Sequence, residues 1–271
     1  MQRKVEGGNT KAFAVAALSV PPSREDAAGV ERDVEASVDA DSGDREIVVA
    51  RGILGKIYSG ALSLERATEL SQADAKRVRT GAGGQKAINY GEMQADSWSA
   101  ILGLLELGPQ DVFYDLGSGR GALVLQTALE ARCKRCVGVE LSRERHAMAA
   151  TAARRLGQLA ARAQSAPGAA GGEGSIDLAG AAVAVEFKCV DMQQESLEDA
   201  TFVYLMNQDL PRRLNEEIFQ KVHALPQAVR LLTLCPIRGA GVAPSRTFVS
   251  QQTWSQDPIE LFLYELGPTS E

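Results

Sequence analysis

The sequence predicts an α/β fold in which a mostly parallel sheet of seven strands carries helices on both faces. The first observation is a strand, a glycine turn, a helix and a second strand between residues 112 and 140. The second is that strand-like apolar runs alternate with helical segments from residue 110 onward, an order that yields a parallel sheet. The third is the length of 271 residues, which allows one large domain with appendages and an ample core.

The glycine turn follows the apolar residues 112–114 and reads DLGSGRG over residues 115–121. Glycine lets the backbone approach a ligand because no Cβ stands in the way. The second strand ends on Glu140, whose carboxylate can accept hydrogen bonds from both hydroxyls of a ribose. This pattern predicts a binding site for a cofactor that contains adenosine, and therefore an enzyme.

Two classes of cofactor compete for this turn. Gly117, Gly119 and Ala122 also satisfy the relaxed dinucleotide motif of nicotinamide dehydrogenases. Asp115, however, lies two residues before the first glycine, where an acid suits an ammonium and a sulfonium better than a pyrophosphate. We therefore predict S-adenosylmethionine as the cofactor and a class I, Rossmann-like methyltransferase fold. A glycine turn without any ligand is the alternative.

The elements after this unit continue the alternation. Ser142 can cap a helix whose Ala-rich body runs through Arg155, and the Ala, Pro and Gly residues near 160–180 predict a flexible insertion. The remaining pattern predicts strands at 182–189, 201–206 and 230–234, a helix at 212–224, and a final antiparallel pair at 246–254 and 258–266.

The chain before the methyltransferase domain divides into two parts. Residues 1–46 are rich in Asp, Glu, Ser and Gly and contribute much of the net charge of -6, so we predict an acidic, disordered tail. Residues 47–84 carry spaced apolar side chains, which predict a small helical appendage. The catalytic domain is then expected over residues 85–271.

Other classes of protein lack support in the sequence. The four cysteines do not form a disulfide framework in a chain of this length, which favours a reducing compartment. Cys133 and Cys136 have zinc-like spacing, but with only two histidines no second half of a zinc site follows, so no metal is predicted. No apolar stretch approaches the ~20 residues that span a bilayer, and no membrane association is expected.

Several motifs together point to one family. They are, in chain order, YGE at residues 90–92, DLGSG at 115–119, LVLQ at 123–126, GVE at 138–140 and NQ at 207–208. Over roughly residues 85–266 the chain resembles the disruptor-of-telomeric-silencing (DOT) family, the non-SET histone lysine methyltransferases. Its shortness is similar to the compact members in kinetoplastid protozoa.

The resemblance implies an S-adenosylmethionine-dependent enzyme that methylates a lysine in the globular part of histone H3, in nucleosomes and therefore in the nucleus. The cofactor-binding residues would be Tyr90, Glu92, Asp115, Gly117, Gly119, Gln126, Glu140, Asp191 and Met192. Glu92 would hold the amino-acid end, Glu140 the ribose and Asp191 the adenine. Alternatives are a helix cap for Glu92 and a turn cap for Asp191.

The substrate channel implied by the family comprises Asn207, whose amide oxygen would face the incoming amine, and Trp254, for which a core position is the alternative. Asn207 and Glu92 are the implied catalytic residues. The sequence departs from the family at Gln208, Pro211 and Leu261, so the channel is altered more than the cofactor site.

These departures keep other functions open. One alternative is a methyltransferase for another protein lysine or a small molecule, and another is a noncatalytic cofactor-binding chromatin module. Lys76, Arg77 and Arg79 form a basic group that we interpret as a solvated helix end, with weak contact to nucleosomal DNA as the alternative. The sequence makes no prediction of the oligomeric state.

Overall fold

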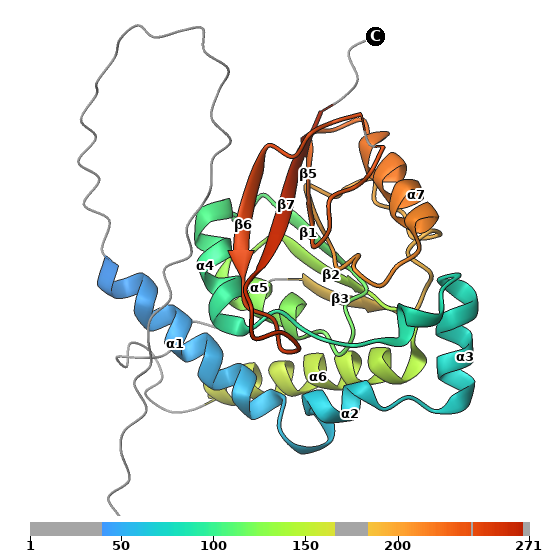
Figure 1. Cartoon of the computed structure of the whole chain (residues 1–271). Coiled ribbons are helices and arrows are strands. Elements are labelled where there is room, and N and C mark those ends of the chain that lie inside the picture. Colours follow the sequence, from blue (N-terminus) through green and yellow to red (C-terminus); the bar gives the residue numbers. More distant parts are fainter. Residues whose placement is uncertain (1–39, 166–183, 240, 268–271) are drawn as a thin grey trace, which may run out of the picture.

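A computed structural model describes the backbone of residues 40–165, 184–239 and 241–267 (Figure 1). Most of the expected disordered tail and most of the expected insertion lie outside these residues. Helix α1 (Ala40–Ile57) begins within the segment that we assigned to the tail. Helix α6 (Arg143–Ser165) continues past Arg155, where we expected it to end.

The sheet has seven strands in the order β3-β2-β1-β4-β5-β7-β6. Their bounds are β1 (Val112–Leu116), β2 (Arg135–Val139), β3 (Ala184–Lys188), β4 (Phe202–Leu205), β5 (Val229–Thr233), β6 (Arg246–Ser250) and β7 (Ile259–Leu266). Strands β1 to β5 pair in parallel, and β7 lies antiparallel between β5 and β6. This confirms the predicted seven-stranded, mostly parallel sheet of the class I methyltransferase type.

Helices cover both faces of the sheet. On one face α4 (Ala95–Leu105) and α5 (Ala122–Glu130) share a buried cluster with the side chains of alternate strand residues, and α6 lies beside them (Figure 1). On the other face α7 (Arg212–His223) packs in a second cluster. Strand β4 illustrates the division, because Phe202 faces the first cluster and Val203 the second.

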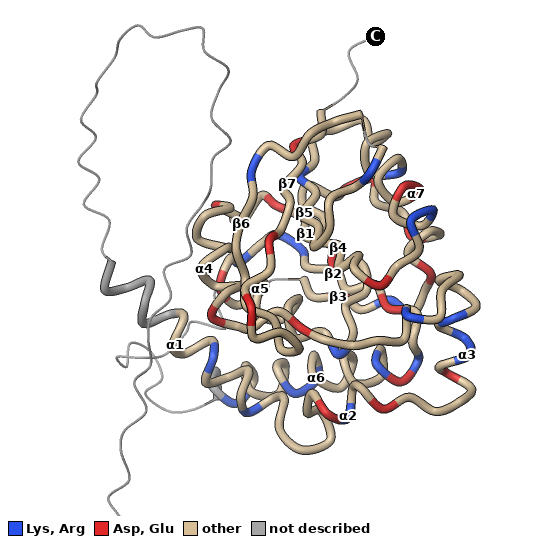
Figure 2. The backbone as a smooth tube through the Cα atoms, viewed as in Figure 1, with Lys and Arg blue, Asp and Glu red and all other residues tan. Residues whose placement is uncertain are grey.

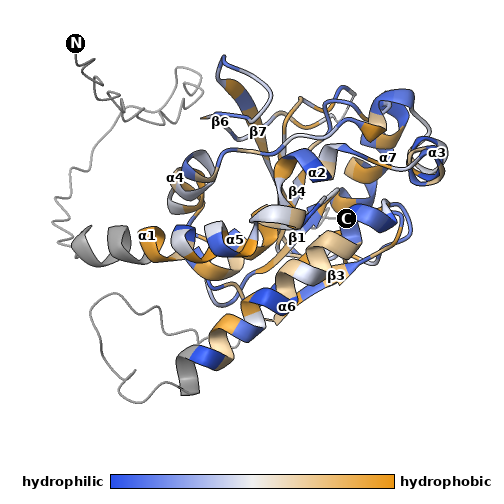
Figure 3. Ribbon diagram, turned by 90° about the horizontal axis from the view of Figure 1, so that it is seen from below, coloured by the Kyte–Doolittle hydropathy of each residue, from blue (hydrophilic) through white to orange (hydrophobic). Residues whose placement is uncertain are grey.

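The segment predicted as a helical appendage, residues 47–84, contains most of α1, the single-turn helix Gly60–Leu62, α2 (Leu64–Thr68) and α3 (Gln72–Gly81). A second single-turn helix, Gln85–Ile88, follows it. Helix α1 packs on α5 and α6, with Ile57 fully buried (Figure 3). None of the described helices is long and apolar enough to cross a bilayer.

Helix α3 is fastened to the start of α6 by Asp74. Its carboxylate accepts hydrogen bonds from the Ser142 hydroxyl and from the N–H groups of Arg143 and Glu144, at 3.1 and 3.2 Å for the latter two. Burial acts against ionisation, but these hydrogen bonds outweigh it and hold the pKa of Asp74 below its usual range. The Ser142 hydroxyl also accepts from the Arg145 N–H at 3.1 Å, which confirms the predicted cap of α6.

Candidate active site

Two adjoining cavities open beside the carboxyl ends of β1, β2 and β4, where parallel α/β sheets bind their ligands. Their volumes are about 630 and 420 Å³. We call them the larger and the smaller cavity. Tyr90, Gly91, Gly117 and Met206 line both, so the two cavities meet at the first glycine of the turn.

The glycine turn takes a conformation that other residues rarely adopt. Gly117 and Gly119 have φ angles of 98° and 56°. A Cβ on Gly119 would also collide with the Tyr90 ring and hydroxyl, so the turn admits Tyr90 only because this residue is glycine. The loop of residues 90–92, which we call the front loop, therefore packs closely on the turn, and the close approach of a ligand to these glycines stays a prediction.

Glu140 is placed at the end of β2 as expected and lines the larger cavity. Its two carboxylate oxygens accept the N–H groups of Gly119 and Ser142 at 2.8 and 2.7 Å. Burial raises the pKa of Glu140, although Arg145 and these hydrogen bonds oppose the effect. Each oxygen retains a lone pair for a further donor.

The loop after β3 forms another part of the wall of the larger cavity. Asp191 and Met192 both line the larger cavity. One oxygen of Asp191 accepts the Gln193 N–H at 2.9 Å, so the turn cap that we considered as the alternative is formed. The second oxygen makes no hydrogen bond within the described part of the chain.

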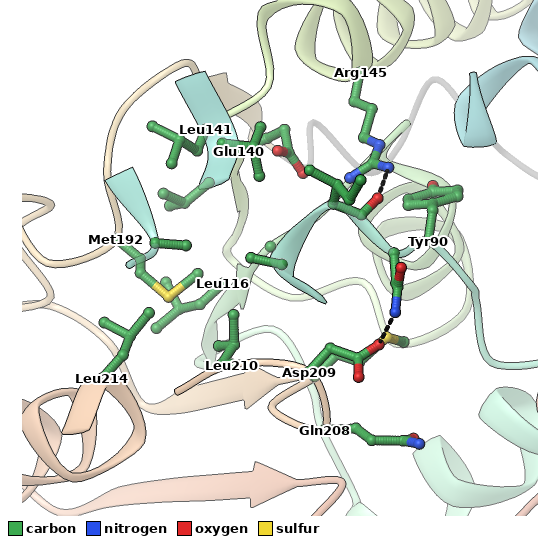
Figure 4. Close-up of a pocket in the computed structure, with 18 of the residues that line it drawn as sticks. Tyr90, Leu116, Glu140, Leu141, Arg145, Met192, Gln208, Asp209, Leu210 and Leu214 are labelled. Atoms are coloured by element: carbon green, nitrogen blue, oxygen red, sulfur yellow. Dashed lines mark hydrogen bonds between the residues drawn. The ribbon is translucent and has the colours of Figure 1, made fainter. Parts of the chain in front are cut away.

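Figure 4 shows the larger cavity with Glu140 and Leu141 toward one end and Gln208 and Asp209 toward the other. Asp209 accepts a hydrogen bond from the Asn89 amide at 2.9 Å, which links the loop after β4 to the residue just before the front loop. An acidic group therefore lies toward the end of the cavity opposite Glu140 (Figure 4).

The front loop of residues 90–92 is bound to the glycine turn through Arg120. The guanidinium donates from Nε and Nη2 to the two oxygens of Glu92, both at 2.7 Å. The Tyr90 hydroxyl donates to Glu92 at 2.5 Å and accepts the Arg120 N–H at 3.0 Å. The Glu92 carboxylate is thus paired within the protein, whereas we expected it to be available for a ligand ammonium.

Asp115 is the carboxylate that remains without such a partner. It is 4% exposed, lines the smaller cavity and makes no side-chain hydrogen bond within the described residues. Burial, with a further contribution from Glu140 and Glu92, raises the pKa of Asp115 well above its usual range. A cationic ligand group in this cavity would find an acid with no competing partner.

Gln126 lies on α5 beside the same cavity and supports it from behind. Its amide nitrogen donates to the Ala95 carbonyl at 2.8 Å and to the Ser99 hydroxyl at 2.9 Å. Since Ala95 and Ser99 belong to α4, Gln126 joins the two helices behind the front loop.

The Asn207 side chain is hydrogen-bonded to the backbone of Cys235. Its amide oxygen accepts the Cys235 N–H at 2.7 Å, and its amide nitrogen donates to the Cys235 carbonyl at 3.0 Å. The side chain is 1% exposed and lines neither cavity. Asn207 continues the pairing of β4 and β5 beyond their last strand residues, and its neighbours Met206 and Gln208 reach the larger cavity instead.

Trp254 lies at the rim of the larger cavity, 40% exposed, over the backbone of the front loop. A Cβ on Gly91 would collide with the Trp254 ring, so this contact requires glycine. Leu261, which we placed at a channel position, is fully buried in the core and lines neither cavity.

The basic group on α3 is divided between structural and surface roles (Figure 2). Arg77 donates to the Leu141 carbonyl at 3.0 Å, which ties α3 to the loop after β2. Lys76 is exposed and Arg79 is partly buried. Of the three basic residues, only Lys76 is exposed to solvent as predicted, whereas Arg77 and Arg79 are partly buried.

Sequence reasoning missed the role of Arg120 and of Tyr58, which precedes the expected domain. Tyr58 lines the smaller cavity and its ring lies 4.5 Å from the Arg120 guanidinium. The sequence does contain one indication of the role of Arg120, because a long cationic side chain stands between two glycines of the turn. Its partners could not be read from the sequence, since Tyr58 and Glu92 lie far from it along the chain.

The chain is similar to known methylation proteins. The family model described as Histone methylation protein DOT1 matches residues 73–252, about two thirds of the chain. The Histone-lysine N-methyltransferase, H3 lysine-79 specific, of Caenorhabditis elegans is 55% identical over 53 residues. These are 20% of this chain and 6% of that protein, so the chain spans only a small part of its curated relative.

Two solved structures are also similar. An RNA methyltransferase from Salinibacter ruber, in complex with S-adenosyl-L-homocysteine, has a TM-score of 0.45 and 22% identity, over 64% of this chain and 92% of that chain. TrmN from Thermus thermophilus has a TM-score of 0.43 and 20% identity, over 63% and 48%. On the family match, over a region that contains the glycine turn, Glu140 and the front loop, the chain belongs to the DOT1 family of histone methylation proteins.

Proposed function

We propose that this protein is an S-adenosylmethionine-dependent methyltransferase that modifies a lysine in the globular part of histone H3. The observation that carries the proposal is the pair of cavities that meet at Gly117, with Glu140 lining one and the unpartnered Asp115 lining the other. Membership of the DOT1 family supports the reaction, and the name of the C. elegans relative supports the substrate.

The donor and acceptor groups of the two cavities fit this cofactor. Glu140 would accept the ribose hydroxyls, and Met192 and Leu214 offer an apolar wall for the adenine beside Asp191. Asp115 would bind the ammonium of the methionine end. Gly117, where the cavities meet, would then lie close to the region where the adenosine and methionine parts join.

When bound, the cofactor would supply an activated methyl group on a sulfonium, and the substrate lysine must reach it as an unprotonated amine. A free lysine has a pKa of ~10.4, so an apolar, dry channel that lowers this pKa is the main requirement. Met206 and Trp254 line the part of the larger cavity next to the front loop and could exclude water there. No acid and histidine pair is required.

Asp209 would serve an earlier stage of the reaction. An acid at the rim of the larger cavity attracts a protonated lysine before it enters the channel. We propose that the channel begins between Asp209 and Trp254, in place of the Asn207 position that the sequence suggested.

Histone H3 in nucleosomes is the proposed partner and the nucleus the proposed location, because histone methylation is the activity named for the family. The exposed Lys76 could contribute weak contact to nucleosomal DNA. Methylation of another protein lysine, or of a small molecule, would use the same cofactor residues and differ only in the channel.

Calorimetry followed by methyl transfer tests the proposal. The protein should bind S-adenosylmethionine and S-adenosylhomocysteine but not NAD. With labelled cofactor it should methylate nucleosomes, and Asp115→Asn should abolish transfer while the variant remains folded. Tight binding of NAD would contradict the proposal, as would cofactor binding without transfer to nucleosomes, free histone H3 or any protein of a lysate.

A further inference from the structure

Arg120 lies in the glycine turn, between Gly119 and Gly121. The first glycine of this turn, Gly117, lines both cavities. Arg120 is 9% exposed, and its guanidinium lies over the Tyr58 ring at 4.5 Å. Burial disfavours the charge, but the hydrogen bonds and charge of Glu92 outweigh it and raise the pKa of Arg120. The side chain is therefore a permanent cation next to the smaller cavity.

The guanidinium has hydrogen-bond donors to spare. Nε and Nη2 each donate to one oxygen of Glu92, and Nη1 donates to the Leu62 carbonyl at 2.6 Å. An arginine has five N–H donors, so two remain after these three bonds are counted in the described part of the chain. Arg120 lines the smaller cavity, so a ligand bound there would lie beside this side chain.

The same cavity also contains the unpartnered Asp115. A buried acid without a partner and a cation with free donors match a group that carries both an ammonium and a carboxylate. The methionine end of S-adenosylmethionine is such a zwitterionic group. A carboxylate would form charge-assisted hydrogen bonds with a guanidinium, which are among the strongest in proteins.

We propose that Arg120 binds the α-carboxylate of the cofactor's methionine end, while Asp115 takes its α-ammonium. This rests on the proposed use of S-adenosylmethionine. Tyr58 and Leu62, which hold Arg120, lie before the family match that begins at residue 73, so the appendage helps to form the cofactor site.

Arg120 could instead act only by holding Glu92 and the front loop in place. The two roles differ in their dependence on the ligand. A residue that contacts the carboxylate affects only ligands that have one, whereas a residue that only positions the front loop affects every ligand of the cavity equally. A pair of ligands that differ in this one group therefore separates them.

The experiment is calorimetric titration with S-adenosylhomocysteine and with its decarboxylated analogue, which keeps the ammonium. The intact chain should bind S-adenosylhomocysteine about 10- to 100-fold more tightly than the analogue. Arg120→Gln should remove this preference, with most of the loss falling on S-adenosylhomocysteine. Arg120→Lys keeps the positive charge but loses the paired N–H donors of the guanidinium, so it should retain part of the preference for S-adenosylhomocysteine. This variant also provides the test if Arg120→Gln fails to fold.

Glu65→Gln is the control, because it removes an exposed acid that lines neither cavity and should leave the ligand preference intact. Equal binding of the two ligands by the intact chain would overturn the Arg120 assignment, as would an equal loss for both ligands in Arg120→Gln. If the intact chain binds neither ligand, the proposed cofactor is wrong and the Arg120 assignment falls with it.

Discussion

Asp115 is a buried carboxylate whose side chain makes no hydrogen bond among the described residues. Burial, then Glu140 and Glu92, raise the pKa of Asp115 above its ordinary value of about 3.9. The folded state therefore holds this proton to higher pH than the unfolded state does. The free energy of unfolding must fall as the pH rises from the ordinary value to the raised one.

Asp115→Asn should remove this pH-dependent cost. At pH 8 the variant without ligand is expected to be more stable than the natural chain by about 1 to 3 kcal/mol, the cost of a buried group without a partner. The difference should shrink as the pH is lowered toward 4, and urea unfolding across this range measures it. A variant that is less stable at every pH would show that Asp115 supports the fold.

Binding should also change the proton content of the site. If a ligand ammonium lies against Asp115, the acid ionises and the complex releases a proton. The apparent enthalpy of S-adenosylhomocysteine binding at pH 7 should then differ between phosphate and Tris, whose ionisation enthalpies differ. Identical enthalpies in the two buffers would mean that no net proton is released.

Glu92 contributes to the stability of the fold through its ion pair with Arg120. Its side chain and that of Arg120 are 16% and 11% exposed and form a two-bond ion pair. Glu92→Ala leaves the guanidinium buried with a lost partner, so the unfolding free energy should fall by about 3 to 5 kcal/mol. Denaturant unfolding tests this, with exposed Glu65→Ala as the control. A loss below 1 kcal/mol would show that this ion pair does not stabilise the fold.

At the scale of elements, the ends of β4 and β5 are joined by a side chain. Asn207 uses both atoms of its amide on the Cys235 backbone. A strand that ends in Asn was expected to present this residue to the substrate. The tight pairing of parallel strands instead turns Asn207 inward and leaves Met206 and Gln208 at the cavity.

Asn207→Ala should therefore lower the stability of the fold more than it lowers turnover. The change removes the partner of the Cys235 N–H and leaves the Cys235 carbonyl with the Thr233 hydroxyl at 2.9 Å, and we expect the unfolding free energy to fall by about 2 kcal/mol. Thermal or urea unfolding measures this loss. The opposite pattern, unchanged stability with a severe loss of turnover at saturating substrate, would return Asn207 to the substrate channel.

At the scale of the whole molecule, the local pattern predicted the strand, glycine turn and second strand, because period and turn chemistry are written in adjacent residues. Glu140 followed from its place at the end of a strand. The contacts of Arg120 did not, because Tyr58, Leu62 and Glu92 meet it only after α1 has packed on α5 and the front loop has closed. The length of α6 was underestimated because its Ala-rich end gives little apolar periodicity.

The central claim is that this site methylates a lysine of the globular part of histone H3, and mass spectrometry of nucleosomes tests it most directly. Nucleosomes incubated with the protein and S-adenosylmethionine should gain methyl groups on a globular-domain lysine of H3, and Asp115→Asn should give none. Methylation confined to the histone tails would contradict the account, as would unmodified histones in a lysate where another protein is labelled.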